Sequence, residues 1–125
     1  MVTEPDISID GITYACWNGT YAVVQQCADT VTHAKIKAGV SINGLEYPVK
    51  EISDRAFGWH SDWEPSEKQL MSVEIPKSIT KIGNQAFYRC PLLQKVTFPE
   101  STITSIGSQA FSGCEALDSI VLPKV

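Results

Sequence analysis

The residues best suited to chemistry lie in one polar segment, GWHSDWEPSEKQ, at positions 58–69. His60 is close to Asp62 and Glu64, which together could move a proton, and Trp59 and Trp63 place two indoles beside them. Nucleophilic catalysis needs a nucleophile, a base and an orienting group that converge. No Gly-x-Ser-x-Gly turn accompanies these residues. We therefore predict that the protein is not an enzyme and uses no cofactor.

The same five residues could instead serve binding. Exposed tryptophan side chains stack on sugars and anchor protein partners. In that interpretation Trp59, His60, Asp62, Trp63 and Glu64 form a partner-binding site. The alternative is that one or both indoles fold back over the neighbouring chain and only cover it.

The histidines, cysteines and charged residues of the sequence do not indicate metal binding or nucleic-acid binding. His33 and His60 have no Cys-x-x-Cys or His-x-x-x-His partner, so we expect no metal site. Ten Lys and Arg against fourteen Asp and Glu give a net charge of −4 without a basic run, which argues against nucleic acid. No apolar stretch approaches the roughly 18 residues that would span a membrane, so we expect no membrane insertion.

The first ten residues, MVTEPDISID, lack the basic start and apolar core of a secretory signal. The protein is therefore cytoplasmic if Met1 is its native start, or extracellular if a signal was removed before it.

An internal repeat dominates the rest of the chain. Residues 79–99 align with residues 103–123 at an offset of 24 without a gap, and the matching positions include Ile82 and Ile106, Ala86 and Ala110, and Cys90 and Cys114. A third copy begins at Val49 and ends at Pro76, and the segment rich in tryptophan is an insertion of about seven residues within it. Insertions in one repeat map to surface loops, so the candidate binding residues lie on a loop.

Each copy has the pattern of one strand followed by a corner. Leu-x-x-Val-x-Ile-Pro alternates as a half-buried strand does, and the proline ends it. A Gly then permits a tight turn, and Asp54, Asn84 and Ser108 are residue types that cap a short helical turn. Interior phenylalanines follow at equivalent positions: Phe57, Phe87 and Phe111. Since no copy can bury its apolar face alone, we predict an α+β solenoid of about three stacked coils, with parallel strands and short helical turns.

Residues 1–48 lack the repeat and are predicted to form β-hairpins that cap the first coil. Three turn signals support this: Asp10-Gly11, Asn18-Gly19 and Asn43-Gly44. The expected strands cover residues 6–9, 12–17, 20–27, 33–37 and 45–49. The chain then divides into a cap, 1–48, and the repeats, 49–125, with copies at 49–76, 77–99 and 100–125.

The four cysteines are expected to remain thiols. A two-residue turn at Asn18-Gly19 sets Cys16 opposite Tyr21 and Cys27 opposite Asp10, about 20 Å apart and too far for a disulfide. Cys90 and Cys114 occupy the same position in adjacent copies, where side chains point the same way. We predict that they form a buried thiol ladder.

Two further surfaces follow from this arrangement. The outward strand positions, which include Lys95 and Thr97, form a face of only about 250 Å², too small for tight recognition without the loops. The second surface is the end of the solenoid, where the final coil would leave apolar residues uncovered. We therefore expect either end-to-end self-association through residues 114–125 or a longer natural array.

The motif I-x-x-I-G-x-x-A-F-x-x-C-x-x-L-x-x-V-x-x-P resembles the BspA-like leucine-rich repeat family. Residues 82–99 and 106–123 match it closely, whereas the first copy has His60 in place of the cysteine. The resemblance implies a secreted or cell-surface bacterial protein that serves as a non-catalytic adhesion or protein-interaction module. Its partner would be a host extracellular protein or glycan. The alternative is a structural spacer or cap within a longer surface protein or assembly.

Overall fold

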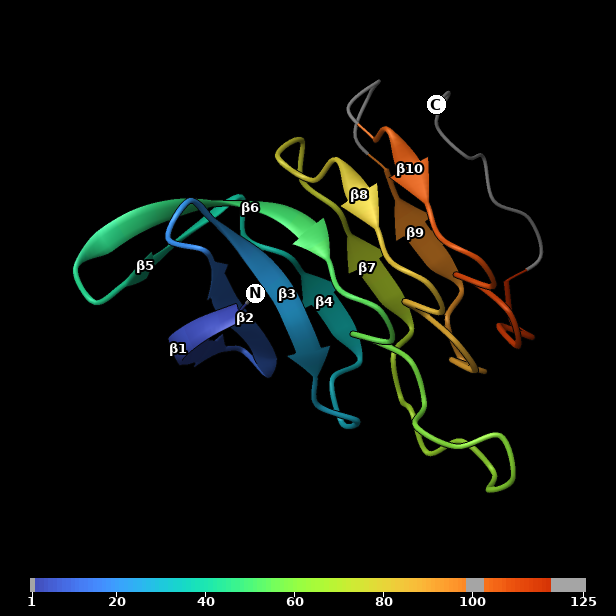
Figure 1. Cartoon of the computed structure of the whole chain (residues 1–125). Coiled ribbons are helices and arrows are strands. Elements are labelled where there is room, and N and C mark those ends of the chain that lie inside the picture. The colour runs from blue at the N-terminus through green and yellow to red at the C-terminus, as the bar shows by residue number, and fades with distance from the viewer. Residues whose placement is uncertain (1, 99–102, 118–125) are drawn as a thin grey trace.

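A computed structural model describes residues 2–98 and 103–117 of the chain, and these residues form strands and turns without a helix (Figure 1). In chain order the strands are β1 (Val2–Ile9), β2 (Ile12–Trp17), β3 (Tyr21–Cys27), β4 (His33–Lys35), β5 (Gly39–Ile42), β6 (Leu45–Ile52), β7 (Ser72–Glu74), β8 (Lys81–Ile82), β9 (Lys95–Thr97) and β10 (Ser105–Ile106).

The N-terminal strands form the predicted hairpins. β1, β2 and β3 pair antiparallel in sequence, and β5 pairs antiparallel with β6. Both residues of each Asp-Gly or Asn-Gly turn have positive φ, for example 53° at Asn43 and 80° at Gly44. Asn, Asp and Gly tolerate this left-handed conformation better than other residues do, so the three turn predictions are confirmed.

The predicted register of the second hairpin is wrong by one residue. Trp17 faces Tyr21, so the loop between β2 and β3 holds the three residues 18–20 instead of two. Cys16 therefore faces Ala22. A further register shift between Thr13 and Tyr14 places Cys27 opposite Ile12, two residues from the predicted partner. The two cysteines still lie at opposite ends of the strand pair, and all four cysteines are free thiols.

Two sheets with parallel pairing run through the repeats and continue into the N-terminal part. In one sheet β3, β6, β8 and β10 are successive parallel neighbours, and in the other β4, β7 and β9 are. The segment expected as a hairpin strand at 33–37 is thus β4, which pairs parallel with β7. The hairpin strand that was missed is β5.

A single column of aromatic rings fills the interior of the coils. The rings of Phe57 and Phe87 stack with centroids 4.9 Å apart, and those of Phe87 and Phe111 with centroids 5.1 Å apart. Phe57 and Phe87 are fully buried, and Phe111 is partly buried. The prediction that equivalent phenylalanines of successive repeats line up is confirmed.

The predicted helical turns are absent from the described residues, so the α+β assignment is wrong for them. Arg55, Gln85 and Gln109 directly follow the expected cap residues and have φ of 55–58°, which is left-handed and ends a helix before it starts. The side chains of the expected caps bridge adjacent coils instead. Asp54 Oδ1 accepts the Asn84 N–H at 2.7 Å, and Asn84 Oδ1 accepts the Ser108 N–H at 2.8 Å.

The hydrogen bonds accepted by Asp54 and Asn84 form a side-chain ladder between coils. The glycines of the repeats are needed for the close approach of the coils at this ladder, and not for a turn. Neither Gly83 nor Gly107 has a positive φ. A Cβ atom on Gly83 would lie 2.5 Å from Asp54 Oδ1, and one on Gly107 would lie 2.5 Å from Asn84 Oδ1. Adjacent coils therefore approach so closely here that only glycine fits.

Candidate functional site

The inserted loop, residues 58–70, projects away from both sheets (Figure 1) and is fastened to the next coil by Arg89. The guanidinium of Arg89 donates from Nη1 to the carbonyl oxygens of Ser61 and Glu64, the latter at 2.8 Å. The carbonyl oxygen of Arg89 accepts the Ser66 hydroxyl at 2.7 Å. One arginine thus joins three points of the loop, and two of its bonds are charge-assisted.

Tyr88 provides a second attachment. Its hydroxyl donates to Asp62 Oδ1 at 2.6 Å, and the Arg55 guanidinium lies over its ring, 5.4 Å from the centroid. The hydrogen bond to the Asp62 carboxylate raises the pKa of Tyr88 above its usual value. Asp62 is therefore committed to holding the loop and is only partly available to a partner.

The returning end of the loop is anchored in the interior by Lys68, which is only 5% exposed. Its ammonium donates to the carbonyl oxygen of Cys27 at 2.8 Å and forms an ion pair with Asp29 at 3.1 Å. Buried charges are stable when they are paired and hydrogen-bonded in this way. No sequence motif marks Lys68, because both of its partners lie about 40 residues earlier in the chain.

The structure separates the two tryptophans that the sequence placed together. Trp59 is 4% exposed, and its backbone N–H donates to the Tyr88 carbonyl oxygen at 2.8 Å. Its indole packs against the His60 ring with centroids 4.2 Å apart. Trp63 is 94% exposed. Trp59 thus folds back and covers the coil, and Trp63 alone presents its indole to solvent.

The loop tip around Trp63 is ordered by short-range contacts. The Ser61 hydroxyl oxygen accepts the backbone N–H groups of Trp63 and Glu64 at 3.1 and 3.2 Å. His60 Nε2 lies 3.5 Å from Glu64 Oε2, and both side chains are mostly exposed. The outcome is a compact turn with an indole at its tip and carboxylates on either side.

The cysteines supply no accessible nucleophile. The Cys90 thiol donates to the Phe57 carbonyl oxygen at 3.1 Å, and the Cys114 thiol donates to that of Phe87 at 3.1 Å, which confirms the buried ladder. Burial raises the pKa of Cys90 to about 12 and that of Cys27 to about 11. Both groups are protonated thiols at neutral pH, and the thiolate is the nucleophilic form.

The outward face of the sheet β4-β7-β9 includes β4, a strand that the sequence analysis did not place in it. Lys95 and Thr97 are exposed on β9, and β4 contributes His33 and Lys35 beside them. His33 Nδ1 lies 2.7 Å from the Ser72 hydroxyl oxygen. The outward positions expected at 119 and 121 lie outside the described residues, as does the part of the self-association segment after residue 117.

Residues 2–98 and 103–117 contain no group of three or more His, Cys, Asp or Glu side chains placed to hold a metal ion. They also contain no helix with the length and apolar character needed to cross a bilayer.

Comparison with solved structures identifies close relatives of this arrangement. A leucine-rich repeat protein from Bacteroides capillosus is 31% identical with a TM-score of 0.82, over 96% of this chain and 83% of that one. A leucine-rich cell surface protein from Faecalibacterium prausnitzii is 29% identical with a TM-score of 0.76, over 94% of this chain. A leucine-rich repeat protein from Bacteroides ovatus is 29% identical with a TM-score of 0.79, over 95% of this chain. The chain spans 30% of the length of each of the latter two.

The family comparison agrees with the structural one. None of the curated proteins compared with the chain matches it. The family described as "BspA type Leucine rich repeat region (6 copies)" matches residues 38–125, which is most of the chain. The chain therefore belongs to the BspA-type leucine-rich repeat family.

Proposed function

We propose that this protein is a non-catalytic interaction module at the surface of a bacterial cell and that the Trp63 loop is its main contact. Its family and its similarity to a protein named as a leucine-rich cell surface protein support a surface role in general. Secretion and adhesion to a host protein or glycan are the more specific form of this proposal.

The observation that carries the proposal is the exposure of Trp63 on a loop that is held firmly in place. Arg89, Tyr88 and Lys68 fasten the loop at separate points, yet its tip leaves an indole almost fully in solvent. A fixed loop loses little conformational entropy on binding, so more of the contact energy appears as affinity. Tryptophan is also the residue type most enriched among side chains that dominate binding energy.

The surroundings of Trp63 indicate the chemistry of the partner. Asp62 and Glu64 flank the indole with carboxylates, and the exposed His60 lies beside Glu64. An indole bordered by hydrogen-bond acceptors suits a partner with an apolar face and many donors, such as a sugar ring or a basic protein segment. Lys95 and Thr97 on the sheet face would extend the contact for a larger partner.

The proposal is tested by binding to arrays of immobilised extracellular-matrix proteins and free oligosaccharides. Trp63→Ala should reduce binding to any captured species by at least about tenfold, as expected for a dominant contact residue. Leu45→Ala is the matched control, because it also removes an exposed apolar side chain, on the β5–β6 hairpin. Trp59→Ala is a poor test because that indole is buried and its loss would disturb the loop.

Failure of this test would favour the structural alternative. If no arrayed species binds, or if Trp63→Ala and Leu45→Ala bind equally well, the chain is better described as a spacer or cap. Its coverage of only 30% of two longer relatives is the observation that supports this second function.

Self-association through the last coil remains part of the proposal. The N–H of Phe57 donates to Ala86 and that of Phe87 donates to Ala110, whereas the N–H of Phe111 has no acceptor among residues 2–98 and 103–117. A further coil or a second copy could supply that acceptor. Sedimentation velocity at increasing concentration should then show a dimer, and a strictly monomeric protein would contradict self-association.

A further inference from the structure

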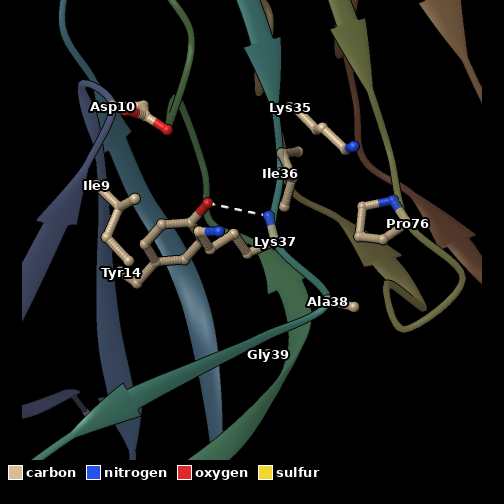
Figure 2. Close-up of a pocket in the computed structure, with 9 residues that line it drawn as sticks. All are labelled: Ile9, Asp10, Tyr14, Lys35, Ile36, Lys37, Ala38, Gly39 and Pro76. Carbon is tan, nitrogen blue, oxygen red and sulfur yellow. Dashed lines mark hydrogen bonds between the residues drawn. The ribbon is translucent and has the colours of Figure 1, made fainter.

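A cavity of about 410 Å³ lies where the N-terminal hairpin meets the edge of the sheet β4-β7-β9, far along the chain from the Trp63 loop (Figure 2). Asp10 and Tyr14 come from the β1–β2 hairpin on one side, and Lys35 and Pro76 lie on the other. Its volume is within the range of roughly 300–1,000 Å³ that is typical of ligand sites.

The cavity gives access to a free strand edge. β4 is the outermost strand of its sheet, and the Ile36 N–H donates to the Glu74 carbonyl oxygen of β7 at 3.2 Å. Because successive residues of a strand direct their N–H and C=O groups to opposite sides, those of Lys35 point away from β7. No hydrogen bond among the described residues uses them. Lys35 therefore offers one donor and one acceptor to an extended ligand.

Tyr14 forms the inner wall of the cavity and is fully buried. Its phenol oxygen accepts the backbone N–H of Lys37 at 3.0 Å, which ties the N-terminal hairpin to the chain just after β4 (Figure 2). Burial raises the pKa of Tyr14 above its usual value, so the phenol carries no charge at neutral pH. Tyr14 therefore shapes the cavity, and the groups that a ligand can reach belong to Lys35 and its neighbours.

Charge and apolar surface complete the lining. Lys35 and Lys37 oppose a single carboxylate, Asp10, so the cavity is locally positive in a chain of net charge −4. The partly exposed side chain of Ile9 provides apolar surface beside these groups. The lining thus suits a ligand that carries a carboxylate, an apolar group and an extended main chain together.

We propose that this cavity binds the C-terminal end of an extended peptide. The peptide main chain pairs with the N–H and C=O of Lys35 and so adds a strand beside β4. Its terminal carboxylate lies beside the ammonium groups of Lys35 and Lys37. Its last side chain packs against Ile9. This site is separate from the Trp63 loop and does not depend on the function proposed for it.

The first test is a titration of ¹⁵N-labelled protein with acetyl-Gly-Ala-Val, followed by backbone amide chemical shifts. The free acid should shift the amides of Lys35, Lys37 and Gly39 in a saturable way. The same peptide with a C-terminal amide should bind at least about tenfold more weakly, because it lacks the charge that pairs with the lysines. Equal binding of acid and amide, or no shift at millimolar peptide, would overturn the proposal.

Two further comparisons separate a peptide site from a general anion site. N-acetylvaline has the same carboxylate and side chain without the extended main chain, so it should bind more weakly than the tripeptide. Equal affinity would overturn the pairing with β4. The double variant Lys35→Gln/Lys37→Gln should weaken tripeptide binding about tenfold. Lys50→Gln is the matched control, since Lys50 is an exposed lysine outside the cavity, and equal loss in both variants would also contradict the proposal.

Discussion

At the scale of single residues, the most consequential feature is the side-chain ladder that joins the coils. Asp54 and Asn84 each use one Oδ1 atom to accept the backbone N–H at the equivalent position of the next coil. Glycine at positions 83 and 107 lets the coils approach closely enough for these bonds. The residues that would cap a helix in another context therefore set the spacing of the repeats here.

This ladder gives a direct prediction for Asn84. Asn84→Ala removes the acceptor of the Ser108 N–H and should lower the free energy of unfolding by about 1 kcal/mol, since water can partly replace an exposed acceptor. Urea denaturation measures the change. Asn84→Asp is the control, because aspartate keeps Oδ1 and already serves in this way at position 54. An equal loss in both variants would show that the bond between coils is not the cause.

At the scale of elements, the inserted loop owes its conformation to the coil that follows it. Arg89 holds the carbonyl oxygens of Ser61 and Glu64, and no bond of comparable strength within the loop replaces this contact. Losing charged hydrogen bonds of this kind costs roughly 1.5–3 kcal/mol each. The loop should therefore open when Arg89 is removed, even if the coils remain folded.

Limited proteolysis with a glutamyl endopeptidase tests this expectation at Glu67, because Pro65 prevents cleavage after Glu64. Arg89→Ala should be cleaved in the loop at least about tenfold faster than the unmodified chain, because cleavage of a native loop follows its opening equilibrium. Lys81→Ala is the matched control: Lys81 is an exposed cationic side chain on β8, and no hydrogen bond among the described residues joins its side chain to the loop. Cleavage of both variants at the same rate would contradict the role of Arg89.

Most of the repeat architecture was predictable because it depends on local patterns that recur. Equivalent phenylalanines had to stack once the repeats stacked, and the Asp-Gly and Asn-Gly turns had to be tight. The prediction of helical turns was wrong because Asp54 and Asn84 are residue types that commonly cap helices. In the structure they accept N–H groups from the next coil, and nothing in the neighbouring sequence indicates this contact.

The candidate site was predictable only in part, for a related reason. The sequence located the inserted loop and its two indoles but could not decide which indole was buried. That outcome depends on contacts of Tyr88 and Arg89, which lie about 25–30 residues later. The cavity at Tyr14 and Lys35 was missed altogether, because it forms between a hairpin and a sheet edge and follows no motif.

At the scale of the whole molecule, the hairpins and the coils share one core. A single cluster of buried side chains extends from Ile12 in β2 to Cys114 in the last described coil. β3 pairs with β6 and β4 pairs with β7, so both sheets also cross the boundary predicted near residue 48. Such a molecule should unfold in one cooperative transition. The division into a cap and repeats therefore describes where the sequence repeat begins, and not two units that fold separately.

The aromatic column provides the test of this cooperativity. Phe87 is stacked on both faces and fully buried, so Phe87→Ala should lower the free energy of unfolding by about 3–5 kcal/mol. Phe111 is only partly buried, so Phe111→Ala should cost less. Urea unfolding followed by far-UV circular dichroism and by tryptophan fluorescence should give coincident curves in each variant. Trp17 directly follows Cys16 of the shared cluster, and the buried Trp59 lies two residues after Phe57 of the same cluster. If the fluorescence and dichroism unfolding curves of Phe87→Ala had different midpoints, the coils would unfold independently of the hairpins. The shared cluster of buried side chains would then not couple the two parts.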